Sequence, residues 1–151
     1  MEKVRTRVEY LRIFGKVVQK VKDSLIIWDF NDINRASKGE AKRGAFILAS
    51  CFIDHLSCYY SGEKSTKLNY VVFVNKYLSM YDGQELYKDL RSKLVHNYSL
   101  GNKYALTHNN SKLHLIKDSN GRTIINLRNF IHEINNAKDK YFTELENEEE
   151  L

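Results

Sequence analysis

The chain has 151 residues, of which 42% are apolar and 28% are charged, a composition ordinary for a globular domain. No segment approaches the ~20 consecutive apolar residues of a membrane-spanning helix, and the N-terminal MEKVRTRVEY segment lacks the apolar run of a secretion signal. Proline is absent, which permits long uninterrupted helices. We therefore expect one cytoplasmic domain with no membrane segment.

Charge is distributed unevenly along the chain. The formal net charge is +5, but residues 144–151 hold five glutamates and no basic residue, so the remainder carries +10. We expect residues 1–143 to form the domain and residues 144–151 to be an acidic, frayed tail. A basic domain attracts phosphate-bearing partners such as RNA, and the alternative is a solvated lysine-rich surface.

The first predicted helix spans residues 2–30. Its apolar residues form two heptad series offset by three, which indicate one buried stripe: Val4, Leu11, Val18 and Leu25, with Phe14, Val21 and Trp28. The polar segment 31–39 breaks this pattern. A second helix is predicted over residues 40–60 and ends at Ser61 and Gly62.

Two further helices are predicted before the sequence pattern changes. Ser65 or Thr66 is placed to cap a third helix, in which apolar residues follow helical rather than alternating spacing. Asp82 and Gly83 form a break, after which a fourth helix carries Leu86, Leu90 and Leu94 and ends within residues 97–101.

Residues 104–127 contain three short β-like runs separated by polar residues. Asn120 and Gly121 favour a hairpin turn, because both residues accept positive φ angles. A last helix is predicted to begin near Leu127. The expected fold is mainly α, an antiparallel four- to five-helix bundle with a small β-hairpin or meander inserted before the last helix.

Arg91 and His96 are the residues best suited to carry out catalysis. Histidine exchanges protons near neutral pH, and arginine binds phosphate through a planar set of donors, so together they suit metal-independent phosphodiester cleavage. In a regular helix their side chains point about 140° apart. They would converge if the helix loosened, if arginine spanned the gap, or if two copies met. The alternative is a surface arginine and a helix-ending histidine.

This motif and the helices around it resemble the HEPN superfamily, whose members are helical bundles with an Arg-x4–6-His motif near the end of a late helix. Arg91 and His96 match with four intervening residues, and the resemblance covers roughly residues 2–143. It implies metal-independent RNA cleavage in a cleft between two protomers. Arg91 would then hold the scissile phosphate, and His96 would act in acid–base chemistry.

The sequence continues through Asn97 to Tyr98, giving Arg-x4-His-x-Tyr. This form is similar to HEPN toxins that pair with a small nucleotidyltransferase antitoxin, which implies that Tyr98 accepts an adenylyl group. The alternative is a packing aromatic at a helix end. Many active relatives have Asn, Asp or His after the arginine, whereas this chain has the shorter Ser92. Ser92 and Asn97 are candidate supporting residues.

Asp54 is the third candidate supporting residue, because it lies among apolar residues of the second helix, where a carboxylate needs a partner. Either it pairs with Arg91 across the bundle or it lies exposed on the polar edge of its helix. Cys51 and Cys58 are expected to be buried, reduced thiols. Neither their spacing nor that of His108 and His114 is typical of a zinc site, so we expect no metal or cofactor.

The resemblance thus implies a metal-independent endoribonuclease of HEPN type that acts as a homodimer. It also implies that the protein pairs with an antitoxin in a toxin–antitoxin or defence system. A second reading is a non-catalytic HEPN-like bundle that binds nucleic acid, nucleotide or a partner protein. A third is a helical interaction module whose basic first helix contacts a partner or an RNA backbone. Glycine-rich phosphate loops, nucleophile elbows and His-Glu-x-x-His motifs are absent from the sequence.

Overall fold

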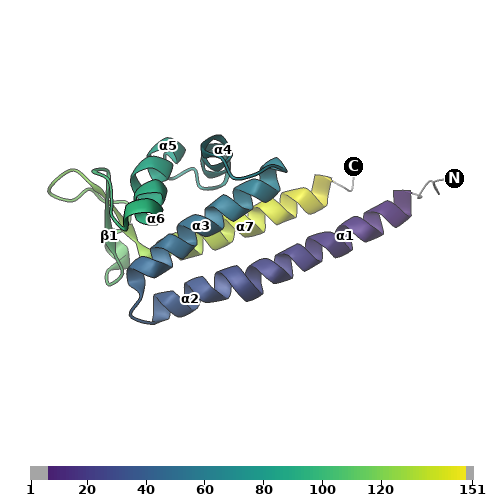
Figure 1. Cartoon of the computed structure of the whole chain (residues 1–151), viewed down its shortest axis with the longest axis horizontal. Coiled ribbons are helices and arrows are strands. Elements are labelled where there is room, and N and C mark those ends of the chain that lie inside the picture. The colour runs from purple at the N-terminus through teal and green to yellow at the C-terminus, as the bar shows by residue number, and fades with distance from the viewer. Residues whose placement is uncertain (1–6, 149–151) are drawn as a thin grey trace.

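The computed structural model describes residues 7–148. Helix α1 (Arg7–Ser24), the π-helical segment η1 (Leu25–Phe30) and α2 (Asn31–Lys38) follow without a break and form one long rod (Figure 1). The polar segment after residue 30, predicted to interrupt the helix, is therefore helical. Ile33 is fully buried within it, so packing against the next helix outweighs its weak apolar pattern.

The π-helical turn also explains why Trp28, the last residue of the second heptad series, is not buried as predicted. A π-helix forms hydrogen bonds between residues five apart, which changes the face that each following side chain occupies. Leu25 is buried, but Trp28, predicted to point inward, is 68% exposed. Val18 is buried as expected, whereas Val4 lies outside the described residues.

The second and third predicted helices form close to their expected bounds. Helix α3 (Lys42–Ser61) ends where Gly62 adopts a left-handed conformation with φ 69°, which glycine accepts at little cost. Helix α4 (Lys67–Tyr77) begins at Thr66, whose Oγ1 accepts a hydrogen bond of 3.1 Å from the Asn69 N–H. Both the stop signal and the cap were visible in the sequence.

The fourth predicted helix consists of three consecutive segments. These are α5 (Gly83–Glu85), the π-helical segment η2 (Leu86–Ser92) and α6 (Lys93–Asn97). Leu86, Leu90 and Leu94 are buried as predicted, so the whole stretch is anchored to the core by one face. The candidate motif therefore begins in a π-helical turn and ends in a short α-helix.

The β insertion forms where it was predicted, but its strands pair differently. Strand β1 (Tyr104–Thr107) and strand β2 (Thr123–Asn126) are parallel, with Tyr104 opposite Thr123, so the predicted hairpin or meander is wrong as a description of the sheet. A turn does form at Gly121, but it supports only one isolated antiparallel bridge, between Lys117 and Thr123. Along the chain, the 3-10 turn η3 (Ser111–Leu113) follows β1 and precedes β2.

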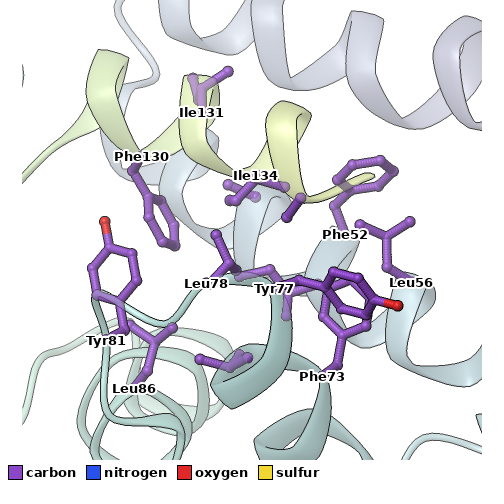
Figure 2. Packing of buried hydrophobic residues seen from close by; sticks show 14 of the residues in the cluster. Phe52, Leu56, Phe73, Tyr77, Leu78, Tyr81, Leu86, Phe130, Ile131 and Ile134 are labelled. Atoms are coloured by element: carbon purple, nitrogen blue, oxygen red, sulfur yellow. The ribbon is translucent and has the colours of Figure 1, made fainter. Parts of the chain in front are cut away.

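The core lies between α3, α4 and α7 (Leu127–Glu148), as Figure 2 shows. Phe52 and Leu56 of α3 lie on the same side of the core as Phe73 of α4, while Phe130 of α7 packs against Tyr81 with ring centres 5.7 Å apart. Burying each such side chain contributes about 1.5–3 kcal/mol. The mainly α fold with a small sheet before the last helix is thus confirmed, and α7 begins at the predicted residue.

Helix α7 continues further than the sequence suggested. Residues 144–148, expected to be frayed, are helical, while residues 149–151 lie outside the described residues. Tyr77 donates a hydrogen bond of 2.7 Å to Glu144, whose carboxylate also lies 3.2 Å from Lys76 Nζ. The Tyr77 hydrogen bond, followed by Lys76, lowers the pKa of Glu144. The acidic end of α7 is therefore fastened to α4.

We expect Glu144→Gln to weaken the dependence of folding stability on acid pH. A lowered folded-state pKa means that the carboxylate stabilises the fold above its unfolded-state pKa, and this contribution is lost as the pH falls through the folded-state value. Urea unfolding between about pH 7 and pH 3 would show the smaller loss in the variant. Glu63→Gln, at an exposed glutamate without an ion pair in the described structure, is the control. Identical pH profiles for wild type and Glu144→Gln would contradict the prediction.

Candidate functional site

Arg91 is turned inward from η2 toward helix α3. Its Nε donates a hydrogen bond of 2.6 Å to Asp54 Oδ2, and the two side chains are only 18% and 11% exposed. The buried neighbours Leu90 and Leu94 hold this part of the chain against the core. The prediction that Asp54 pairs with Arg91 across the helices is confirmed, and the alternative of an exposed Asp54 is wrong.

The second oxygen of Asp54 is also bonded. Ser65 Oγ donates a hydrogen bond of 2.9 Å to Oδ1, so one carboxylate joins η2 to the loop before α4. The guanidinium of Arg91 lies 5.2 Å from the centre of the Tyr87 ring, a cation–π contact. Burial acts to lower the pKa of Arg91, but the Asp54 hydrogen bond and charge outweigh it and raise the pKa. Arg91 is therefore held charged and in place.

The Arg91 guanidinium keeps binding capacity after this pairing. Only its Nε is bonded to Asp54, and no hydrogen bond links its two Nη groups to any of the described residues. Arginine donors in such a fork suit two oxygens of one phosphate. The arrangement thus offers a positioned cation with free donors next to α3.

His96 differs from Arg91 in its surroundings. It is exposed near the end of α6, and no hydrogen bond or ion pair joins it to Arg91 or to another described residue. Arg91 belongs to the π-helical turn, which ends at Ser92, whereas His96 lies in the α-helical segment that follows. Among the described residues, the two side chains of the motif are thus not joined by any direct polar contact.

The supporting residues next to the motif have no polar contacts of their own. Ser92 is half-buried and Asn97 is exposed, and within residues 7–148 neither side chain forms a hydrogen bond. Asp54 is thus the one predicted supporting residue that contacts the motif directly. The sequence hint for it was a carboxylate among apolar residues, which requires a charged partner.

Tyr98 ends α6 in a left-handed conformation with φ 51°, and its N–H bonds to Leu94 O at 3.1 Å. This conformation costs a residue other than glycine roughly 1–2 kcal/mol. Arg43 of α3 donates a hydrogen bond of 3.1 Å to the Tyr98 carbonyl, and its guanidinium lies 5.2 Å from the ring centre. The side chain is 57% exposed, so Tyr98 is held by its backbone and one ring face rather than buried.

A second polar cluster, which sequence reasoning missed, joins η3, β2 and α7. His114 Nδ1 accepts a hydrogen bond of 3.0 Å from the Asn126 N–H, so Nε2 carries the proton and donates to Glu133 at 2.9 Å. Tyr81 donates to the other oxygen of Glu133. Burial, followed by the Glu133 charge, raises the pKa of Tyr81 well above its usual value. No sequence spacing marks these residues, because the fold alone brings them together.

Other predicted features are placed as follows. Cys51 and Cys58 are free, but Cys51 is exposed and Cys58 half-buried, so the expectation of two buried thiols is wrong. Among residues 7–148 no group of three or more potential metal ligands forms. None of the described helices is long and apolar enough to cross a membrane.

Comparisons with protein-family models, with curated proteins and with solved structures found no match. The fold and the site together define a mainly α-helical protein with a largely buried Arg–Asp pair between η2 and α3 and an exposed histidine on α6, directly after η2.

We expect Asp54→Ala to lower the free energy of unfolding by about 2 kcal/mol, because it leaves the Arg91 charge buried without a partner. Urea denaturation followed by circular dichroism would measure the loss. Asp29→Ala removes a more exposed carboxylate, paired with His55 at 3.0 Å, and should cost less than about 1 kcal/mol. Equal losses for the two variants would argue against a structural Arg91–Asp54 pair.

Proposed function

We propose that this protein is a metal-independent endoribonuclease of HEPN type. The observation that carries the proposal is the arrangement of Arg91, held charged by Asp54 with free Nη donors, and of His96, exposed on the same late helix. One residue suits the binding of a phosphate and the other the transfer of a proton. The basic charge of the chain supports a polyanionic substrate.

The reaction consistent with these groups uses the RNA itself as the nucleophile. The ribose 2′ oxygen attacks the adjacent phosphorus, the bond to the 5′ oxygen breaks, and a 2′,3′-cyclic phosphate and a 5′ hydroxyl form. The proton of the 2′ hydroxyl is removed and one is returned to the 5′ oxygen. In this proposal His96 makes one of these transfers, and Arg91 neutralises the charge on the phosphate.

A homodimer is part of this proposal. Arg91 is largely buried against Asp54, whereas His96 is exposed and has no polar contact with Arg91 among the described residues, so a second copy is proposed to complete the site. Two copies that meet along α6 would put the histidine of one near the arginine of the other. Such an enzyme suits the toxin half of a toxin–antitoxin or defence pair.

The alternative function is a non-catalytic HEPN-like bundle that binds nucleic acid, nucleotide or a partner protein. Two observations favour it: the short Ser92 forms no hydrogen bond among the described residues, and His96 is not held by a partner there. A histidine without a positioning group is a less effective proton-transfer residue. The two functions differ in whether RNA is cut.

We expect the purified protein to cut single-stranded RNA in EDTA, and His96→Ala to slow cutting at least about 100-fold. His132→Ala, which removes another exposed histidine from α7, should cut like wild type. Gel electrophoresis of end-labelled RNA gives the rate, and mapping of the product ends tests for cyclic phosphate. Circular dichroism establishes that each variant is folded. If the wild-type protein leaves RNA intact, the endoribonuclease proposal is wrong and the non-catalytic binding function replaces it.

We propose in addition that Tyr98 is an adenylylation site that a partner nucleotidyltransferase uses to silence the enzyme. The exposed ring at the end of the motif and the neighbouring Arg43 guanidinium support it, since an added phosphate beside His96 would repel RNA. The Tyr98 oxygen would attack the α-phosphorus of ATP, releasing pyrophosphate, while its proton passes to a base on the transferase.

Co-expression with a nucleotidyltransferase encoded beside this gene should add one adenylyl group to Tyr98. Peptide mass spectrometry locates it among the ten tyrosines, and Tyr98→Phe should remain unmodified. The modified protein should also lose RNA cleavage. An unmodified Tyr98 peptide after co-expression with an active transferase would overturn this assignment.

A further inference from the structure

Two polar hollows lie side by side where α2 ends, α3 begins and α7 begins. The larger has a volume of about 420 Å³ and is lined by Asn34, Ser37, Lys38, Lys42, Arg128 and Ile131. The smaller has a volume of about 80 Å³ and is lined by His108, Asn109, Ser111, Asn126 and Arg128. Arg128 lines both hollows, which together are named the α7 hollow.

The α7 hollow is basic. Three of its lining residues are cationic, Lys38, Lys42 and Arg128, and none is acidic. Lys42 Nζ donates to the Ser37 carbonyl at 2.6 Å, while Lys38 and Arg128 form no ion pair within the described part of the chain. Cations gathered without carboxylates repel one another, and a bound anion relieves that repulsion.

Asn126 supplies a second and independent sign of a ligand. The residue is fully buried, and its Oδ1 accepts hydrogen bonds from the N–H groups of Arg128 at 3.1 Å and Asn129 at 3.3 Å. These two bonds fix which end of the amide is oxygen. The Nδ2 group is buried without a hydrogen-bond partner, although Asn126 lines the smaller hollow. A buried donor left unpaired costs about 1–3 kcal/mol, so an acceptor in the hollow would be favoured.

The properties of the hollow fit a phosphate group. The first turn of a long helix such as α7 carries a partial positive charge that favours anions. A volume of about 80 Å³ exceeds the roughly 30 Å³ of a water molecule in the liquid. Water alone would satisfy Asn126 but would leave the charges of Lys38 and Arg128 unbalanced.

The hollow is connected to the candidate motif through the first turn of α3. Lys42 lines the hollow, and the next residue, Arg43, contacts both the carbonyl and the ring of Tyr98. The end of α6 and the start of α7 also lie toward the same end of the long axis in Figure 1. The adjacent residues Lys42 and Arg43 thus join the hollow to the end of the motif.

We propose that the α7 hollow is a phosphate-binding subsite that holds the backbone of the RNA strand beside the motif. Arg128 and Lys38 bind the phosphodiester charge, and Asn126 Nδ2 donates a hydrogen bond to a phosphate oxygen. The identity of the ligand as RNA rests on the proposed function, whereas the phosphate chemistry rests on the hollow itself.

Binding is best measured without cleavage, in the His96→Ala protein and in EDTA. Fluorescence anisotropy with a labelled single-stranded RNA of about twelve nucleotides gives Kd at several salt concentrations. Adding Arg128→Ala should weaken binding about fivefold and reduce the slope of log K against log salt by about one. Adding Lys140→Ala, which removes a cation from the second half of the same helix, should leave Kd within about twofold.

Asn126→Asp tests the role of the amide more sharply. It keeps an oxygen for the Arg128 and Asn129 N–H groups, but replaces the Nδ2 donor by a negatively charged acceptor. We expect a loss of RNA affinity larger than that of Arg128→Ala. If thermal unfolding shows that this variant is not folded, Lys38→Ala, at an exposed residue, takes its place with an expected loss of about threefold.

Each result decides the proposal. Kd values for Arg128→Ala equal to those for Lys140→Ala would overturn the subsite even if wild type cuts RNA. Conversely, binding that depends on Arg128 in a protein that leaves RNA intact would support the subsite and refute the endoribonuclease. Failure of the one is thereby distinguished from failure of the other.

Discussion

The ion pair between Arg91 and Asp54 is the interaction on which the arrangement of the motif depends. Asp54 lies on the buried face of α3, where a carboxylate without a partner would be strongly disfavoured. Arg91 satisfies one of its oxygens and Ser65 the other. These bonds hold Arg91 and the π-helical segment η2 against α3. His96, five residues later, has no such partner among the described residues.

A second contact fixes the other end of the motif. Arg43 binds the Tyr98 carbonyl, so α3 holds the motif segment at two points about three helical turns apart. Tyr98, whose backbone adopts the left-handed conformation, ends α6 before the chain continues into the β insertion. The backbone around His96 is therefore restrained although its side chain is not. That combination suits a residue whose partner is supplied by a substrate or by a second copy of the chain.

Features written in local sequence were predictable, and features that depend on tertiary contacts were not. Thr66, Gly62 and the start of α7 follow from capping and conformational preferences that act over a few residues. The outward position of Trp28 depends on a π-helical turn that no residue type marks. The direction of strand pairing was also hidden, because a four-residue strand has little pattern from which to choose its neighbour.

In the candidate site, too, some residues could be predicted from the sequence and others could not. Pairing of Asp54 with Arg91 could be inferred because a carboxylate among apolar residues requires a cation, and the motif supplied one. Neither Asn126 nor Arg128 could be found in this way. Each is unremarkable in sequence, and their significance comes from a hollow whose walls belong to α2, α3, η3 and α7.

The α7 hollow also gains rigidity from the missed polar cluster. Asn126 caps α7 with its side chain and donates its backbone N–H to His114, which is in turn held by Glu133. The junction of β2 and α7 is consequently fixed from both sides. Donors that are already ordered lose little conformational entropy when they bind a phosphate, which is the physical advantage of building a subsite there.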